Sequence, residues 1–390
     1  MLIIKNYFSN FSLIEQFACS MISFKPKEDG FTLYEQLNDD EVYDFAKHNL
    51  IDSIIGYRLI EHYGEGSIPN HWLESYNSTN KRIASYLKEL DRVADIFSKN
   101  GIPLVPLKNS GIAKAIYPYP GLVPMGDVDT LVRRSDFIHA HEILIKNGYE
   151  IASPNKYHIA DVKISYRTGG SEYKTILPNG QQLWFELQWR PVEGRFLRPD
   201  QEPDGDRLVD RSISTDGSKL RILSPEDNLL QVCLHTAKHS YVRAPGFRLH
   251  LDVDRIVNGQ NIDWDLFLRD VFSHKVKVPV YFSLLIPTIF FNTPIPNEVL
   301  KKIKPKPIKL YILSHWIKNI GLFNPDEFKF GKISFLIWNA MLYDSILGMI
   351  RAVFPRSSWM QDKYAFNNSL YLPFYYIKRL YDLVIKRVGT

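Results

Sequence analysis

Apolar side chains recur at every third or fourth position through much of the first hundred residues, the spacing that places them on one face of an α-helix. The clearest instance is residues 79–99, with apolar positions at Ile83, Tyr86, Leu87, Leu90, Val93, Ala94 and Phe97. Gly101 follows, and glycine commonly ends a helix. Asn38 precedes a run of acidic residues, which predicts the cap and first turn of another helix. We therefore predict a helical region over residues 1–100 and assign it no chemistry.

The pattern then changes, and short apolar runs alternate with polar or Pro- and Gly-rich segments. Residues 102–107 predict a short buried strand, residues 108–111 a polar turn and residues 112–117 a helical piece. A loop leads to residues 127–132, Asp-Val-Asp-Thr-Leu-Val, which predict a second strand. Residues 135–146 predict a helix with its cap at Ser-Asp. This alternation favours strands packed against helices.

Two further segments, 172–177 and 182–189, flank the Pro-Asn-Gly sequence of residues 178–180, a strong signal for a hairpin turn. Residues 157–166 alternate polar and apolar positions and predict another strand. Together these segments predict a small mixed sheet with helices against one face.

After the predicted sheet, residues 191–220 are rich in Pro, Gly, Asp and Arg and predict a long surface loop with room for a short strand. Ser224 is followed by proline and two acids, which predicts the start of a helix. The rest is expected to be mostly helical, with proline breaks at positions 279, 287, 294, 305 and 307. The expected fold class is therefore α/β, of the α+β kind, divided into a helical region (1–100), a core (101–222) and a mainly helical domain (223–390).

Charge and composition limit the kinds of ligand and the cellular compartment that we expect for this protein. The chain has 390 residues, and 48 Lys and Arg against 43 Asp and Glu give a net charge of +5. This excess is too small to indicate nucleic acid but suits an anionic ligand. Two cysteines argue against a disulfide framework and fit a reducing cytoplasm. We expect a cytoplasmic protein without signal peptide or transmembrane segment. Residues 370–387 mix aromatic and basic side chains; we expect them to pack against the helical domain, with a membrane surface or an acidic partner as alternatives.

Asp127 and Asp129 carry the strongest chemical signal. Side chains alternate along a strand, so both carboxylates are expected on the same face. Neighbouring carboxylates repel each other unless a cation lies between them, and Mg²⁺ typically binds one or two carboxylates together with substrate phosphates. The pair therefore predicts a divalent-metal site, with a solvent-facing strand end as the alternative.

Glu186 is the candidate for a third acidic ligand, which a two-metal phosphoryl-transfer site usually needs. It lies between Phe185 and Leu187, which point to the opposite face of the predicted strand. A charged side chain at such a position costs free energy unless it has a partner. Metal-bound carboxylates on the neighbouring strand would provide one, and an ion pair with Arg190 or a nearby lysine is the alternative.

Lys108, Ser110 and Gly111 form the candidate phosphate-binding segment. Glycine lets the backbone approach a ligand, and a helix N-terminus presents free N–H groups to an anion. Ser110 is expected to donate its hydroxyl to a phosphate oxygen and Lys108 to add positive charge. A helix cap with a solvated lysine is the alternative.

The sequence around these residues resembles a family of poorly characterised bacterial nucleotidyltransferases in the DNA polymerase β superfamily. The shared motifs are Leu-Lys-x-x-Gly, Tyr-Pro, Gly-Asp-Val-Asp-Thr-Leu-Val and a later Gly-Tyr, and they support the resemblance over roughly Ile102 to Asn258. Many members have Lys-Gly where this chain has residues 108–111, arginine where it has residues 124–126, and histidine where it has Gln188.

The resemblance implies a polymerase β-like core and Mg²⁺-dependent transfer of a nucleotidyl group from a nucleoside triphosphate (NTP), with Mn²⁺ as a substitute metal. Asp127, Asp129 and Glu186 would hold the metal. The acceptor would be a hydroxyl or phosphate group of a metabolite, a peptide or a protein, and no nucleic acid is expected.

His235, Lys238 and His239 lie on one side of the predicted helix after residue 224. The resembled family has a similar Leu-His-x-x-Lys-His string, which in related folds lies near the nucleotide, so Lys238 is expected to contact the triphosphate. The histidine pair is a weak zinc motif, and pairing with carboxylates is the commoner role. Charge networks between the two halves of the chain are expected at Arg243, Arg248 and Asp252.

Two other classes of function fit the same residues. In a glycosyltransferase, an Asp-x-Asp pair holds a nucleotide-sugar through Mn²⁺, but a Rossmann-like half should precede the motif where this chain predicts helices. A non-catalytic nucleotide-binding protein with the same fold is the other alternative.

Overall fold

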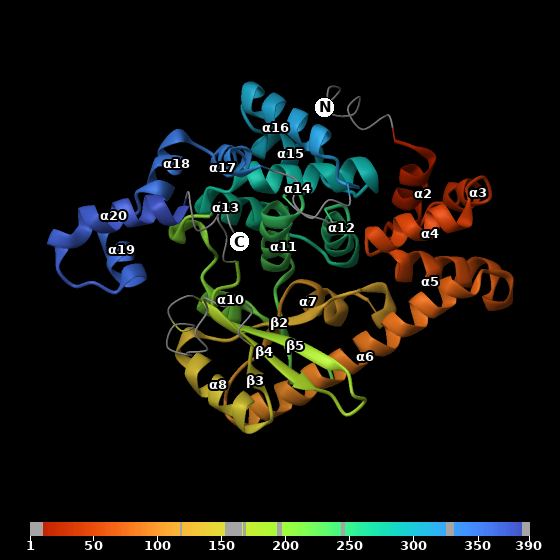
Figure 1. Cartoon of the computed structure of the whole chain (residues 1–390), viewed down its shortest axis with the longest axis horizontal. Helices are drawn as coiled ribbons and strands as arrows, with labels where there is room; N and C mark the ends of the chain where they lie inside the picture. The colour runs from red at the N-terminus through yellow and green to blue at the C-terminus, as the bar shows by residue number, and fades with distance from the viewer. Residues whose placement is uncertain are drawn as a thin grey trace.

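A five-stranded mixed sheet in the order β1-β2-β5-β4-β3 lies at the centre of the chain (Figure 1). The computed structural model describes residues 11–117, 119–152, 166, 169–192, 197–242, 246–324 and 331–383. The strands are β1 (Val105–Pro106), β2 (Asp127–Leu131), β3 (Glu150–Ile151), β4 (Gly170–Ile176) and β5 (Gln182–Gln188). β2 and β5 pair in parallel and the other neighbours are antiparallel. A smaller sheet pairs β6 (Ile213–Ser214) with β7 (Arg221–Ile222).

One face of the main sheet packs on α6 (Asn70–Lys99) and α8 (Phe137–Lys146), which run beneath it in Figure 1. Val128, Phe185 and Leu187 point into this core and are fully buried. Burying such a side chain contributes about 1.5–3 kcal/mol. These residues therefore hold β2 and β5 in place and leave the opposite face of the two strands for polar side chains.

A second core joins helices from both ends of the chain. Its N-terminal members are α2 (Leu13–Ile22), α3 (Asp29–Tyr34), α4 (Asp39–His48) and α5 (Asp52–Tyr63). Its C-terminal members are α11 (Pro225–His239), α12 (Leu249–Gly259), α13 (Trp264–His274), α14 (Lys277–Phe290), α15 (Asn297–Ile303), α16 (Pro307–Ile320) and α17 (Lys332–Met341). Between this layer and the sheet lies α7 (Lys108–Ala115), which contacts both α11 and α12.

The last described helices are α18 (Ile346–Val353), α19 (Ser357–Tyr364) and α20 (Leu372–Tyr381), which project from the side of the helical layer (Figure 1). The remaining short elements are α10 (Gly205–Arg211) and the 3₁₀ turns η1 (Glu65–Ser67), η2 (Pro120–Leu122), η3 (Arg134–Asp136), η4 (Pro199–Gln201) and η5 (Ser369–Tyr371).

The predicted fold class is confirmed, and so are the local signals with a clear mechanism. The side chains of Asn38 and Ser224 accept hydrogen bonds from backbone N–H groups in the first turns of α4 and α11. The predicted hairpin joins β4 to β5, and Gly180 adopts a φ of 81° in its turn. In the left-handed region that this turn needs, glycine has no steric cost.

Several predicted boundaries were wrong. The strand predicted over 102–107 is only β1, and the predicted turn at 108–111 is the first turn of α7. The helix predicted from residue 79 begins at Asn70. The predicted loop at 191–220 does carry a short strand, β6, but it also contains α10 and η4. Where each of these elements begins and ends depends on its packing against neighbouring elements, and the local spacing of apolar residues does not show that packing.

Three further predictions have a mixed outcome. Helix α8 follows η3, and no side-chain cap is formed at Asp136. Pro279 and Pro287 lie inside α14 and do not break it; Pro279 is in the first turn, where backbone N–H groups lack a helical partner in any case. The strand predicted at 157–166 falls, except for its last residue, outside the described residues.

Cys19 and Cys233 are both buried and do not form a disulfide. Within the described ranges, no helix combines the length and the apolar character needed to cross a lipid bilayer.

Candidate functional site

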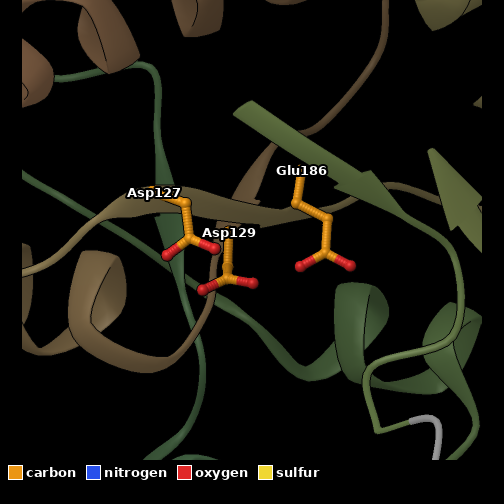
Figure 2. A group of neighbouring side chains, drawn as sticks. All are labelled: Asp127, Asp129 and Glu186. Atoms are coloured by element: carbon orange, nitrogen blue, oxygen red, sulfur yellow. The ribbon is translucent and has the colours of Figure 1, made fainter. Parts of the chain in front are cut away.

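Three carboxylates meet on the polar face of β2 and β5 (Figure 2). Asp129 lies directly opposite Glu186 in the parallel pair, and Asp127 is two residues earlier on the same face of β2. Oxygen atoms of Asp127, Asp129 and Glu186 all lie within 4.8 Å of one another. The structure thus brings together the three acidic residues that the sequence singles out.

Backbone and side-chain hydrogen bonds hold this part of the sheet in register. The Leu107 N–H donates to the Asp129 carbonyl oxygen at 2.9 Å, and the Thr130 hydroxyl donates to the Glu186 carbonyl oxygen at 2.9 Å. Gln188 donates its amide to the Asp129 carboxylate at 3.1 Å. Asp129 is therefore held at its carbonyl oxygen by Leu107 and at its carboxylate by Gln188 of β5, which orients it.

Lys108 contributes the positive charge closest to these acids. Its ammonium pairs with Asp129 and lies 3.5 Å from a carboxylate oxygen of Glu186. Burial disfavours the charged ammonium, but Asp129 and Glu186 outweigh this and raise the pKa of Lys108 above its ordinary value. Lys108 also has a φ of 51°, a backbone conformation that is rare outside glycine and that is often retained at functional sites.

The three carboxylates of Asp127, Asp129 and Glu186 outnumber the single ammonium of Lys108 that pairs with them. Burial and the neighbouring Asp129 raise the pKa of Glu186 to about 7. Partial desolvation, together with Glu186 and Glu172, also raises the pKa of Asp127. The positive charge of Lys108 lowers the pKa of both Asp127 and Glu186, but by less than these causes raise it. A set of oxygen donors that converges and resists ionisation fits a hard divalent cation such as Mg²⁺.

Glu172 is a fourth acidic residue of this face, which sequence reasoning missed. It lies on β4 directly opposite Glu186, where like charges destabilise a strand pair. The sequence contains the information needed to find Glu172, because the hairpin turn at 178–180 fixes the strand register that pairs it with Glu186.

Ser110 and Gly111 have structural partners. The Ser110 hydroxyl is fully buried and accepts a hydrogen bond from the Asp129 N–H at 3.2 Å. A Cβ on Gly111 would lie 2.9 Å from the Pro106 carbonyl oxygen, so the absence of a side chain there lets α7 approach β1. Ser110 therefore positions β2 against α7 and Gly111 positions β1 against α7, and their predicted contact with a phosphate stays a prediction.

Helix α11 brings Lys238 close to the carboxylates. Its charge lowers the pKa of Glu186, although less than burial raises it. His235 and His239 lie against each other, with ring centroids 4.9 Å apart. Across the described part of the chain, the only group of three potential ligands that converges for a metal is the carboxylate group. The contact between Lys238 and a triphosphate stays a prediction.

A buried charge network lies on the other side of α7. Asp252 and Arg255 of α12 are 3.6 Å apart, and the Asn109 amide, with its nitrogen toward α12, donates to the Asp252 carboxylate at 3.2 and 3.3 Å. Arg248 donates to the Pro124 carbonyl oxygen in the loop before β2. The predicted network between the two halves of the chain is thus present at Arg248 and Asp252. Arg243 lies outside the described residues.

The comparisons with known proteins agree with this geometry. The sequence model of a family described as uncharacterised nucleotidyltransferases matches residues 35–292. This range contains both sheets, the three carboxylates and the two lysines beside them. No curated protein matches the chain.

Proposed function

The chain belongs to the uncharacterised nucleotidyltransferase family, and from this premise we propose that it is a metal-dependent nucleotidyltransferase. It transfers a nucleotidyl group from an NTP to a hydroxyl or phosphate group of a metabolite, a peptide or a protein, in the cytoplasm. The observation that carries the proposal is the convergence of Asp127, Asp129 and Glu186, whose oxygens lie within 4.8 Å of one another.

Asp127, Asp129 and Glu186 would hold Mg²⁺, with Mn²⁺ as a substitute. When bound, the metal neutralises charge on the transferring phosphate and lowers the pKa of the acceptor hydroxyl. Gln188 and Ser110 hold Asp129 in place through its carboxylate and its backbone N–H. Because nucleotidyl transfer needs little covalent chemistry from the protein, such positioning and charge neutralisation supply most of the rate.

Lys108 and Lys238 provide positive charge for the triphosphate. Lys108 contacts Asp129 and lies 3.5 Å from Glu186, so its flexible side chain can exchange these carboxylates for phosphate oxygens when the substrate enters. Lys238 acts on Glu186 from α11, so the two lysines lie on different elements beside the same acids. Ser110 serves mainly to position β2 against α7, and Gly111 to let α7 approach β1.

The test is a pyrophosphate-release screen. Full-length protein with Mg²⁺ is incubated with each of the four NTPs, labelled at the α-phosphate, and with fractions of a cell extract. We expect one NTP to give pyrophosphate together with a labelled acceptor, and Asp129→Asn to give neither. The label identifies the acceptor class directly, because it stays on the product.

The two rival functions give different results in the same assay. Hydrolysis of a nucleotide-sugar without consumption of any NTP would instead support a glycosyltransferase. Mg²⁺-dependent NTP binding by calorimetry, without pyrophosphate release in any fraction, would support a non-catalytic nucleotide-binding protein. Either outcome would contradict the proposed transfer reaction.

A further inference from the structure

Helix α20 exposes an apolar stripe. Phe374, Ile377 and Tyr381 recur at intervals of three and four and therefore share one face of the helix. Phe374 is 62% exposed and Ile377 is 67% exposed. Leu370 and Tyr371 of the preceding turn η5 are exposed as well. The sequence led us to expect this segment to pack against the helical domain; the structure leaves these side chains facing solvent.

Helix α18 repeats the arrangement. Ile346, Leu347, Ile350 and Phe354 follow helical spacing and are all exposed, Ile346 to 74%. Isolated exposed apolar residues are normal on a protein surface, but contiguous groups of them mark interaction sites. Two neighbouring helices with such stripes thus indicate an interaction surface.

The two helices are tied together. The Arg379 guanidinium donates to the carbonyl oxygens of Val353 at 3.0 Å and Ala352 at 2.6 Å. The Tyr376 hydroxyl donates to the Pro355 carbonyl oxygen at 2.6 Å. We call α18, α19 and α20 together the C-terminal arm (residues 346–381). Its contacts make it one structural unit, and Figure 1 shows it extending away from the rest of the molecule.

The net charge of the protein resides in this part of the sequence. Residues 346–390 contain seven Lys and Arg but only two Asp, so they carry a net charge of +5, equal to that of the whole chain. The remaining 345 residues have 41 basic and 41 acidic side chains. Arg351 and Lys378 are exposed on the same helices as the apolar stripes. Basic residues beside an apolar helical face are typical of helices that lie on an anionic membrane surface.

We propose that the C-terminal arm binds the surface of an anionic lipid bilayer, with the stripes of α18 and α20 inserted at the headgroup level. Charge decides between this partner and a second copy of the chain. Two arms of the same positive charge repel each other when they pair, whereas the negative surface of an anionic bilayer attracts Lys and Arg side chains. The exposed tyrosines suit the interface, where aromatic rings with a polar end are enriched.

Vesicle flotation of the full-length protein tests the proposal. The probes are vesicles of phosphatidylcholine alone and vesicles of phosphatidylcholine mixed with phosphatidylglycerol. We expect binding to the mixed vesicles, little binding to phosphatidylcholine alone, and release at high salt. The double variant Phe374→Ser/Ile377→Ser should weaken binding about tenfold or more, since it removes two apolar side chains that the bilayer would otherwise bury.

Matched controls lie outside the C-terminal arm. Ile308 is 72% exposed on α16, so Ile308→Ser removes a similar apolar side chain and should leave flotation unchanged. Arg351→Gln/Lys378→Gln should reduce binding several-fold, whereas Lys304→Gln/Lys306→Gln, two exposed lysines outside the arm, should not. Circular dichroism and thermal unfolding verify that each variant folds.

Three results would overturn the proposal. One is the absence of flotation with the mixed vesicles. Another is equal binding to both vesicle types, which would remove the role of charge. The third is sedimentation showing a dimer that Phe374→Ser/Ile377→Ser converts to a monomer, without vesicle binding, which would assign the surface to a second copy. The inference is independent of the proposed chemistry, because arm variants should retain pyrophosphate release.

Discussion

Asp129 and Glu186 lie directly opposite each other on the parallel strands β2 and β5, with their carboxylates on the same face of the sheet. Parallel neighbours cannot be joined by a tight turn, and here the intervening chain adds α8, β3 and β4 before it returns to the edge of β2. Two acids that are distant in the sequence thus meet through sheet topology alone. Since like charges at this separation repel each other, their juxtaposition points to a cationic ligand.

Asp127→Asn and Asp129→Asn should each abolish nucleotidyl transfer while the fold remains intact. We expect a loss of about 10²-fold or more, because a metal supplies several kcal/mol of charge stabilisation and each 1.4 kcal/mol is about a factor of ten. Asp265→Asn is the control, since Asp265 is highly exposed on α13 and its contact is a loose 3.6 Å pair with Lys302. Pyrophosphate release measures activity and thermal unfolding measures the fold. Full activity in both site variants would remove the carboxylates from the mechanism.

Lys108→Met should make the protein depend on a divalent cation for stability. The substitution removes the ammonium that pairs with Asp129, and leaving a partly buried charge without its partner typically costs about 3–5 kcal/mol. In EDTA the variant should therefore unfold at a lower temperature than the wild type. Added Mg²⁺ should raise the unfolding temperature of the variant more than that of the wild type, because the lysine no longer competes for the carboxylates.

Lys114→Met is the matched control for this prediction. Lys114 is also on α7 and pairs with Asp91 at 2.6 Å, but Asp91 does not belong to the carboxylate group. Its substitution should leave the response to Mg²⁺ as in the wild type. If Mg²⁺ stabilises the wild type as much as Lys108→Met, the lysine and the metal do not share these acids.

The free energy of unfolding without metal should fall as the pH rises from about 4.5 to about 7. Burial and Asp129 raise the pKa of Glu186 in the folded protein to about 7, from an ordinary value of 4.5. Between these values the folded state holds a proton that the unfolded state releases, so a rising pH favours unfolding. The raised pKa of Asp127 acts in the same direction.

Urea unfolding in EDTA at several pH values measures this effect. Glu186→Gln should flatten the decline, since glutamine does not titrate. Glu298→Gln, on the exposed surface of α15, should follow the wild type. Parallel curves for the wild type and Glu186→Gln would show that Glu186 ionises in the folded protein as it does in the unfolded chain.

The sequence was sufficient for those features that depend on local chemistry. The alternation of β2 predicts that Asp127 and Asp129 share a face, and the hairpin turn predicts the pairing of β4 with β5. It was also sufficient to select Glu186, because a charge between Phe185 and Leu187 needs a partner across the sheet.

Other features depend on tertiary contacts that no local pattern reports. The contact of the Lys108 ammonium with Asp129 is one example, since only the fold brings the two residues together. The predicted contact of Lys108 with a phosphate stays a prediction. The exposure of Phe374 and Ile377 could not be foreseen either, since an amphipathic helix has the same spacing whether its apolar face is buried by the protein or by another partner.

Gly111→Ala should destabilise the fold by about 1–3 kcal/mol, the usual cost of forcing an extra group into a packed site. Its Cβ would lie 2.9 Å from the Pro106 carbonyl oxygen, which belongs to the backbone of β1 and cannot move aside alone. Gly126→Ala is the matched control, because a Cβ there meets nothing within 4 Å. Urea unfolding should therefore separate the two variants. An unchanged stability of Gly111→Ala together with a loss of NTP binding would instead restore the phosphate-binding role predicted from the sequence, because the added methyl group would then obstruct a ligand and not the neighbouring strand.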